Sequence, residues 1–112
     1  MTDLAQKFCV ACEAGTPPLP IEQAREMLEQ VPGWELVEAE NKLTRRFRFK
    51  DFKEAMAFVN KVADLAESEG HHPDIHISWN RVRLDLTTHA IKGLSENDFI
   101  MAAKISVEGV RD

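Results

Sequence analysis

The sequence predicts one α+β domain in which a four-stranded, mainly antiparallel sheet carries three helices packed on one face. Two pairs of alternating segments are each joined by a short polar turn, and tight turns connect only antiparallel neighbours. One long amphipathic segment separates the two pairs, and a shorter helical segment lies on either side of this arrangement. The expected order of elements is therefore α-β-β-α-β-β-α.

Composition supports a single small domain. The chain has 112 residues, of which 44% are hydrophobic and 29% are charged, and this excludes a disordered or collagen-like chain. No apolar run approaches the roughly 20 residues of a membrane span, and the first residues lack the pattern of a secretory signal. We therefore expect a cytoplasmic protein that does not enter a membrane. Residues 1–20 are expected to be an irregular segment, and residues 21–112 are expected to form the domain.

The first half of the domain begins with a helix expected over residues 21–31, where apolar residues recur at helical spacing before Pro32-Gly33. Residues 34–37 and 42–49 alternate as two strands around the polar turn 38–41. In the second of these strands, the inward face is expected to carry Leu43, Phe47 and Phe49, and the outward face Lys42, Thr44, Arg46, Arg48 and Lys50.

The second half begins with the longest helix, expected over residues 51–69. Asp51 and Glu54 have capping-box spacing, and Gly70 can end the helix in a left-handed conformation. Its apolar stripe comprises Phe52, Ala55, Met56, Val59, Val62, Ala63 and Ala66.

Two more strands are expected over residues 74–79 and 81–88, joined at Asn80. Their inward side chains are expected to be Ile75, Ile77, Trp79, Val82, Leu84 and Leu86. Ser95 and Asp98 mark the start of the last helix. The apolar run 99–103 indicates that this helix is buried on two sides, one of which could be a subunit interface.

Charge is segregated along the chain. The formal net charge of −5 argues against general binding to nucleic acid or to an anionic membrane. The segment from Lys42 to Lys53 is nevertheless strongly basic. This cluster is typical of a solvated strand face, and anion docking is the alternative interpretation.

The two cysteines, Cys9 and Cys12, are too few for a disulfide scaffold. Their spacing raises the possibility of a zinc or thiol-redox site. A tetrahedral zinc site needs four ligands, however, and the adjacent histidines of this chain lack the spacing of a second ligand pair. We therefore expect neither a metal nor an organic cofactor.

The densest chemical feature is the run from Glu67 to Pro73, where the longest helix ends. Glu67 and Glu69 lie in the last turn, where the helix dipole disfavours carboxylates, and His71-His72 follow at once. The helix end and the carboxylates both attract positive charge, which suits imidazoles that act as acids. Histidines are also common at helix ends for the dipole interaction alone, so both interpretations stay open.

Two further histidines are weaker candidates on their own. His89 follows the last expected strand, where it could face the loop that carries His71, although loop histidines are more often merely exposed. His76 is expected on the polar face of a strand in a structural position.

Taken together, these residues resemble the pterin-4a-carbinolamine dehydratase family. The pattern consists of Glu67, three residues, His71-His72-Pro73, five residues, Trp79, nine residues, His89, eight residues and Asp98. The resemblance implies dehydration of 4a-hydroxytetrahydrobiopterin to the quinonoid dihydropterin, which recycles the pterin of hydroxylases such as phenylalanine hydroxylase. It further implies that His71, His72 and His89 are catalytic and that Glu67 binds or orients. Trp79 and Asp98 also read as a core residue and a helix cap, respectively, so we leave both outside the catalytic set.

The expected partners are therefore a small pterin substrate, an aromatic amino acid hydroxylase by functional link, and further copies of this chain. Exposed sheet edges and apolar helix faces favour a homodimer or homotetramer. Some members of the family act instead as dimerisation modules or transcriptional coactivators, and a dehydratase-like protein of another pterin pathway is a further alternative. The three histidines and Glu67 favour the enzyme, because a scaffold does not need them.

Overall fold

The computed structural model describes residues 4–7, 9 and 17–107. Its helices are α1 (Ile21–Leu28), α2 (Phe52–Glu69) and α3 (Glu96–Val107), and its strands are β1 (Glu35–Val37), β2 (Lys42–Arg48), β3 (Asp74–Ser78) and β4 (Arg81–Leu86). Three short 3-10 helices are η1 (Leu4–Gln6), η2 (Glu38–Glu40) and η3 (His89–Ile91). The predicted α+β class and the order α-β-β-α-β-β-α are confirmed.

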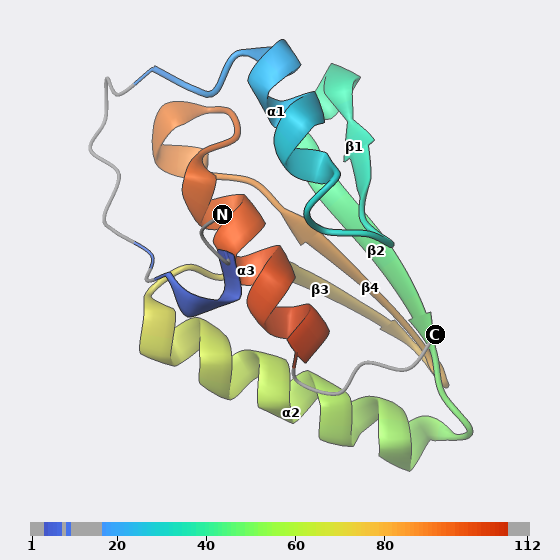
Figure 1. The fold of residues 1–112 in the computed structure, drawn as a ribbon. Coiled ribbons are helices and arrows are strands. Elements are labelled where there is room, and N and C mark those ends of the chain that lie inside the picture. Colours follow the sequence, from blue (N-terminus) through green and yellow to red (C-terminus); the bar gives the residue numbers. More distant parts are fainter. Residues whose placement is uncertain (1–3, 8, 10–16, 108–112) are drawn as a thin grey trace.

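The four strands form one antiparallel sheet in the order β1-β2-β4-β3, and the three helices lie on one side of it (Figure 1). Alternation along β2 and β4 buries Leu43, Phe47 and Leu84 toward the helices. The opposite side of the sheet carries no helix and presents polar side chains. We call this side the open face.

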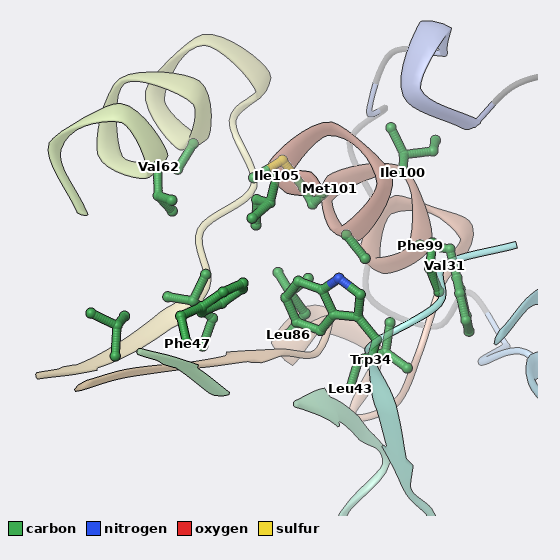
Figure 2. Packing of buried hydrophobic residues seen from close by; sticks show 14 of the residues in the cluster. Val31, Trp34, Leu43, Phe47, Val62, Leu86, Phe99, Ile100, Met101 and Ile105 are labelled. Atoms are coloured by element: carbon green, nitrogen blue, oxygen red, sulfur yellow. The ribbon is translucent and has the colours of Figure 1, made fainter. Parts of the chain in front are cut away.

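The core lies between the helices and the sheet (Figure 2). Aromatic rings fill its centre: Phe47 contacts Trp34 edge-on at 6.3 Å between centroids and Phe58 at 4.8 Å. Such pairs contribute about 0.5–1.5 kcal/mol each beyond the burial of their area.

One inward position of β2 is charged. Arg45 lies between Leu43 and Phe47 on the covered face and is only 8% exposed. Its guanidinium lies 5.0 Å from the Phe47 ring centroid and donates a hydrogen bond to Ser106 Oγ at 3.2 Å. Gly33, at φ 95°, makes room for it, since a Cβ at that position would lie 2.7 Å from the guanidinium carbon. The alternation of β2 therefore holds, but one of its core positions carries a buried cation.

Helix α2 has the predicted caps. Asp51 accepts a hydrogen bond from the Glu54 N–H at 2.9 Å, and Gly70 ends the helix at φ 67°. Its apolar stripe was predicted wrongly at three positions. Phe52 and Ala63 are exposed, whereas Phe58 is buried, because the buried face rotates onto Ala55, Phe58, Val59, Val62 and Ala66.

The turn between β3 and β4 corrects the placement of Trp79. We expected this side chain in the core, yet it is 67% exposed and its backbone is left-handed at φ 53°. Strand β3 ends at Ser78, so strand alternation no longer applies at the next residue. Asn80 is buried instead, and its amide donates to the Phe49 carbonyl at 2.9 Å.

Helix α3 is buried on two sides, as its apolar run predicted: Phe99, Ile100, Met101 and Ala102 are all nearly inaccessible. Residues of the first 20 contribute to this burial. The short helix η1 packs against α3 and places Leu4 in the core, which adds to the core we had expected to begin at Ile21. The chain thus covers both sides of this run by itself. No described helix is long and apolar enough to cross a membrane.

Candidate active site

The candidate site lies where the end of α2 meets the start of α3. Gly70 reverses the chain through its left-handed conformation, and the His71 N–H donates to the Ala66 carbonyl at 3.3 Å. His71 and His72 therefore emerge directly from a rigid helix end. Pro73 is buried after them and favours an extended backbone at His72.

His71 is bound to a carboxylate from the other helix. Its Nε2 lies 2.7 Å from Oδ1 of Asp98, which is 0% exposed. The second carboxylate oxygen, Oδ2, accepts the Thr88 hydroxyl at 2.8 Å and the Ser95 N–H at 3.0 Å. Thr88 Oγ1 in turn lies 2.7 Å from Ser95 Oγ. Both oxygens of this buried carboxylate are thus satisfied, and one is reserved for the imidazole.

These contacts define how the His71 ring is used. With Asp98 as a carboxylate, Oδ1 can only accept, so Nε2 of His71 carries the proton between them. The other ring nitrogen, Nδ1, is then the one available to exchange a proton with a substrate. The His71 side chain is 12% exposed, so it is held in place and still reachable.

His72 is paired in a different way. Its Nε2 lies 2.5 Å from Oε2 of Glu67, five residues earlier in the last turn of α2, and both side chains are largely exposed. This pairing explains the carboxylate at Glu67 in the last turn of α2, a position that the helix dipole disfavours. His72 also leaves its Nδ1 available.

His89 begins η3 and is exposed. Its side chain makes no hydrogen bond or ion pair within the part of the chain that the structure describes. It directly follows Thr88, whose hydroxyl is bound to Asp98, so the loop with His89 is tied to the carboxylate that holds His71. Separate carboxylates therefore hold His71 and His72, and His89 is connected to the Asp98 network only through the backbone of Thr88. Within the described residues, no hydrogen bond joins the three histidines to one another.

Glu69 serves the fold rather than the site. It is mostly buried and accepts the Cys9 N–H at 2.9 Å, and its other oxygen lies 3.9 Å from Lys104 Nζ. Burial, followed by the charge of Glu69 and a hydrogen bond with it, raises the pKa of the Cys9 thiol to about 12. Cys9 is a free thiol, and Cys12 lies outside the described residues. Within the described residues, no three His, Cys, Asp or Glu side chains are arranged to hold a metal ion.

Comparison with known proteins shows the family of this chain. The model of the family "Pterin 4 alpha carbinolamine dehydratase" matches residues 17–107. The chain belongs to the pterin-4a-carbinolamine dehydratase family. A Methylococcus capsulatus protein that carries this dehydratase name is 54% identical over 102 residues, which cover 91% of this chain and 90% of that protein. "Pterin-4-alpha-carbinolamine dehydratase 2, mitochondrial" of Arabidopsis thaliana is 47% identical and aligns with 100% of this chain and 62% of its own length.

A solved structure of this dehydratase family has the same fold. The structure described as "transcriptional coactivator/pterin dehydratase from Brucella Melitensis" superposes with a TM-score of 0.76 at 37% identity. The match covers 80% of this chain and 96% of that chain. The resemblance drawn from the histidine motif is therefore confirmed at the level of family and fold.

Sequence reasoning missed the contact of Asp98 with His71. The capping interpretation is confirmed in part, because Asp98 accepts the Ser95 N–H as a cap does. It was incomplete, since the other carboxylate oxygen binds His71 across 27 residues of sequence. Thr88 was predicted only as the last residue of a strand, and its position directly before His89 is the signal that could have pointed to its contact with Asp98.

Proposed function

We propose that this chain dehydrates a 4a-hydroxytetrahydropterin, such as 4a-hydroxytetrahydrobiopterin, to the quinonoid dihydropterin. The observation that supports this most directly is the buried Asp98 carboxylate that holds His71 by Nε2 at 2.7 Å. The family match and the dehydratase names of the relatives support the substrate class.

The reaction is a proton exchange that imidazoles can perform. The C4a–O bond breaks, and the departing hydroxide takes a proton from an acid and leaves as water. The proton on N5 passes to a base, and the electron pair of that N–H bond forms the N5=C4a double bond. One proton is donated and one is accepted, so no redox partner is required.

His71 is the best-supported acid or base. Asp98 fixes the tautomer and the direction of its ring, as a buried carboxylate does for a catalytic histidine in a Ser-His-Asp triad. Nδ1 can then accept a proton or return one without any rearrangement of the ring. The orientation of this histidine is set before the substrate arrives, which lowers the entropic cost of reaching the transition state.

His72 and His89 are proposed to complete the catalytic set, with Glu67 orienting His72. The exposed Glu67–His72 pair lies beside His71 along the chain and suits a residue that contacts the pterin and exchanges protons with it. His89 serves as the second acid–base group, on the loop that Thr88 ties to Asp98. Hydroxyl groups on the two faces of the ring at C4a would then meet different histidines.

In the cell, this activity serves an aromatic amino acid hydroxylase, because such enzymes release the 4a-hydroxypterin. We propose a cytoplasmic homodimer or homotetramer that works without metal or organic cofactor. Self-association is supported by the exposed apolar side chains of Phe52, Ile77 and Trp79 and by the short edge strands β1 and β3.

Single-turnover dehydration of each 4a-stereoisomer tests the proposal. His71→Ala and His89→Ala should each slow one isomer more than the other, by about 10²–10⁴-fold, and the double variant should approach the uncatalysed rate. His76→Ala is the matched control and should stay within about twofold, because His76 lies on the open face beside Asp85. A double variant that is folded by circular dichroism and dehydrates both isomers at wild-type rates would remove both histidines from the mechanism. A wild-type chain without turnover would favour the binding module instead.

A further inference from the structure

A hollow of about 770 Å³ lies over the sheet. Its lining includes six polar side chains of the open face: Arg46, Arg48, His76, Ser78, Arg81 and Arg83. None of Glu67, His71, His72, His89 and Asp98 belongs to the lining. The hollow is therefore separate from the candidate active site.

The strand register concentrates four arginines in this hollow. Arg46 on β2 lies opposite Arg83 on β4, and Arg48 lies opposite Arg81. Directly opposite side chains in an antiparallel pair start about 5 Å apart, and neighbours two residues along a strand start about 7 Å apart. The four side chains thus rise from the corners of a small rectangle, which we call the four-arginine face.

This arrangement costs stability in the absence of a ligand. Like charges directly opposite each other in a sheet are destabilising, and the four-arginine face contains two such pairs side by side. The side chains of Arg46, Arg48 and Arg81 make no hydrogen bond or ion pair with any other described residue. Only Arg83 has an acidic partner, since its guanidinium lies 3.3 Å from Asp85 Oδ2.

Asp85 cannot neutralise the remaining charge because it is already fully engaged. It accepts the Thr44 hydroxyl at 2.6 Å, and Lys42 and His76 lie within 3.4 Å of it in addition to Arg83. Burial raises the pKa of Asp85, but the Thr44 hydrogen bond and the charges of Lys42 and Arg83 outweigh it and hold the pKa below its ordinary value. Among the described residues, three of the four guanidinium groups therefore lack an acidic partner, and a bound anion would supply the counter-charge.

We propose that the four-arginine face binds a small polyphosphate, the chemistry shared by inorganic triphosphate and the phosphate chain of a nucleotide. Guanidinium groups bind phosphate oxygens through paired N–H donors, and four of them around one hollow match a compact ligand that bears several charges. The volume lies within the range of about 300–1,000 Å³ that is typical of small-molecule sites.

The surroundings disfavour a long polyanion as the occupant. The next row of the open face contains Asp74 opposite Asp85, and Glu35 lies opposite Thr44 in the same row. A nucleic acid strand that crossed the sheet in this direction would meet these carboxylates. The net charge of −5 adds a general repulsion, which a small ligand in a local positive field experiences least.

Calorimetric titration of the full chain with sodium tripolyphosphate tests the proposal, at about 50 mM salt so that screening stays moderate. We expect saturable one-to-one binding with a dissociation constant on the order of micromolar, and orthophosphate at least tenfold weaker. Arg46→Gln combined with Arg81→Gln should weaken binding at least tenfold. The control combines Lys53→Gln with Lys61→Gln. These substitutions remove the same amount of charge from two exposed positions of α2, so the dissociation constant should stay within about twofold of wild type.

The same titration with a nucleoside triphosphate distinguishes an inorganic polyphosphate from a nucleotide as the ligand. Equal affinity for it and for tripolyphosphate supports recognition of the phosphates alone, and tighter binding supports a nucleotide. The proposal is overturned by absent saturation in the wild type, by equal losses in both double variants, or by orthophosphate binding as tightly as tripolyphosphate. It is also overturned if a single-stranded oligonucleotide or an acidic peptide binds this face more tightly than either phosphate ligand.

Discussion

Replacing Asp98 with asparagine tests whether Asp98 sets the tautomer and orientation of His71, because the imidazole itself is retained. The substitution keeps the size of the side chain but replaces one acceptor oxygen by an NH₂ group, which can only donate. Two donors, the Thr88 hydroxyl and the Ser95 N–H, already point at one side of the carboxylate. An NH₂ placed there would leave both of them unsatisfied, at about 1–3 kcal/mol each.

The amide of Asp98→Asn should therefore turn its oxygen toward Thr88 and Ser95 and its NH₂ toward His71. The Nε2 of His71 must then accept rather than donate, which moves its proton to Nδ1, the nitrogen assigned to the substrate. A histidine held in the wrong tautomer loses about 10⁴-fold in the serine-protease triad, and general acid–base catalysis as a whole contributes 10²–10⁴-fold. We expect kcat to fall by about 10²–10⁴-fold and KM to change by less than about threefold.

Steady-state dehydration of freshly generated carbinolamine measures this effect, and urea unfolding measures the accompanying loss of stability. One charge-assisted hydrogen bond is lost, so the free energy of unfolding should fall by about 1.5–3 kcal/mol. Asp85→Asn is the matched control, because Asp85 is also a buried carboxylate with several donors but lies on the open face. It should lose comparable stability and keep kcat. A folded Asp98→Asn protein with kcat within about threefold of wild type would refute the positioning role.

Other substitutions and conditions give further tests. Thr88→Val should lower kcat by about tenfold and the free energy of unfolding by about 1–3 kcal/mol in urea titrations, because Asp98 loses one of two donors on Oδ2. The depressed pKa of Asp85 stabilises the fold at pH values above the unfolded-state pKa of this group. This contribution should be lost as pH falls through the lower folded-state pKa, and Asp85→Asn should unfold with a weaker acid dependence. In a Cys12→Ser background, Cys9 should react with iodoacetamide at about pH 8 at least a hundredfold more slowly than a free thiol, since its pKa is raised to about 12. Sedimentation should show a dimer or tetramer, and a monomer throughout the micromolar range would contradict it.

Local signals in the sequence predicted the elements of the fold well. Helix α2 begins after Asp51 and ends at Gly70 as expected, because caps and left-handed glycines act within a few residues of the helix end. Trp79 was placed wrongly for a related reason. Alternation predicts the direction of a side chain only inside a strand, and the change to a left-handed turn at this residue leaves no mark in the hydrophobic pattern.

Side chains that depend on distant partners were harder to predict. Arg45 follows the alternation of β2 as a core residue would, yet only the fold reveals that Gly33 and Phe47 provide a place for its guanidinium. The pairing of His72 with Glu67 spans only five residues across the end of α2 and could be anticipated. The pairing of His71 with Asp98 joins two helices that the sequence alone does not place side by side.

The Asp98 network makes the start of α3 and the orientation of His71 parts of one hydrogen-bonded unit. Oδ2 helps to begin the helix by accepting the Ser95 N–H, and Oδ1 orients the imidazole. Since Thr88 donates to Oδ2, the proton between Thr88 and Ser95 must come from the Ser95 hydroxyl. Each donor in the chain is thereby assigned, and none can turn away without leaving a buried acceptor short of a partner. A substitution that destabilises the first turn of α3 should therefore lower the activity that depends on His71, even where the substituted residue does not contact the substrate.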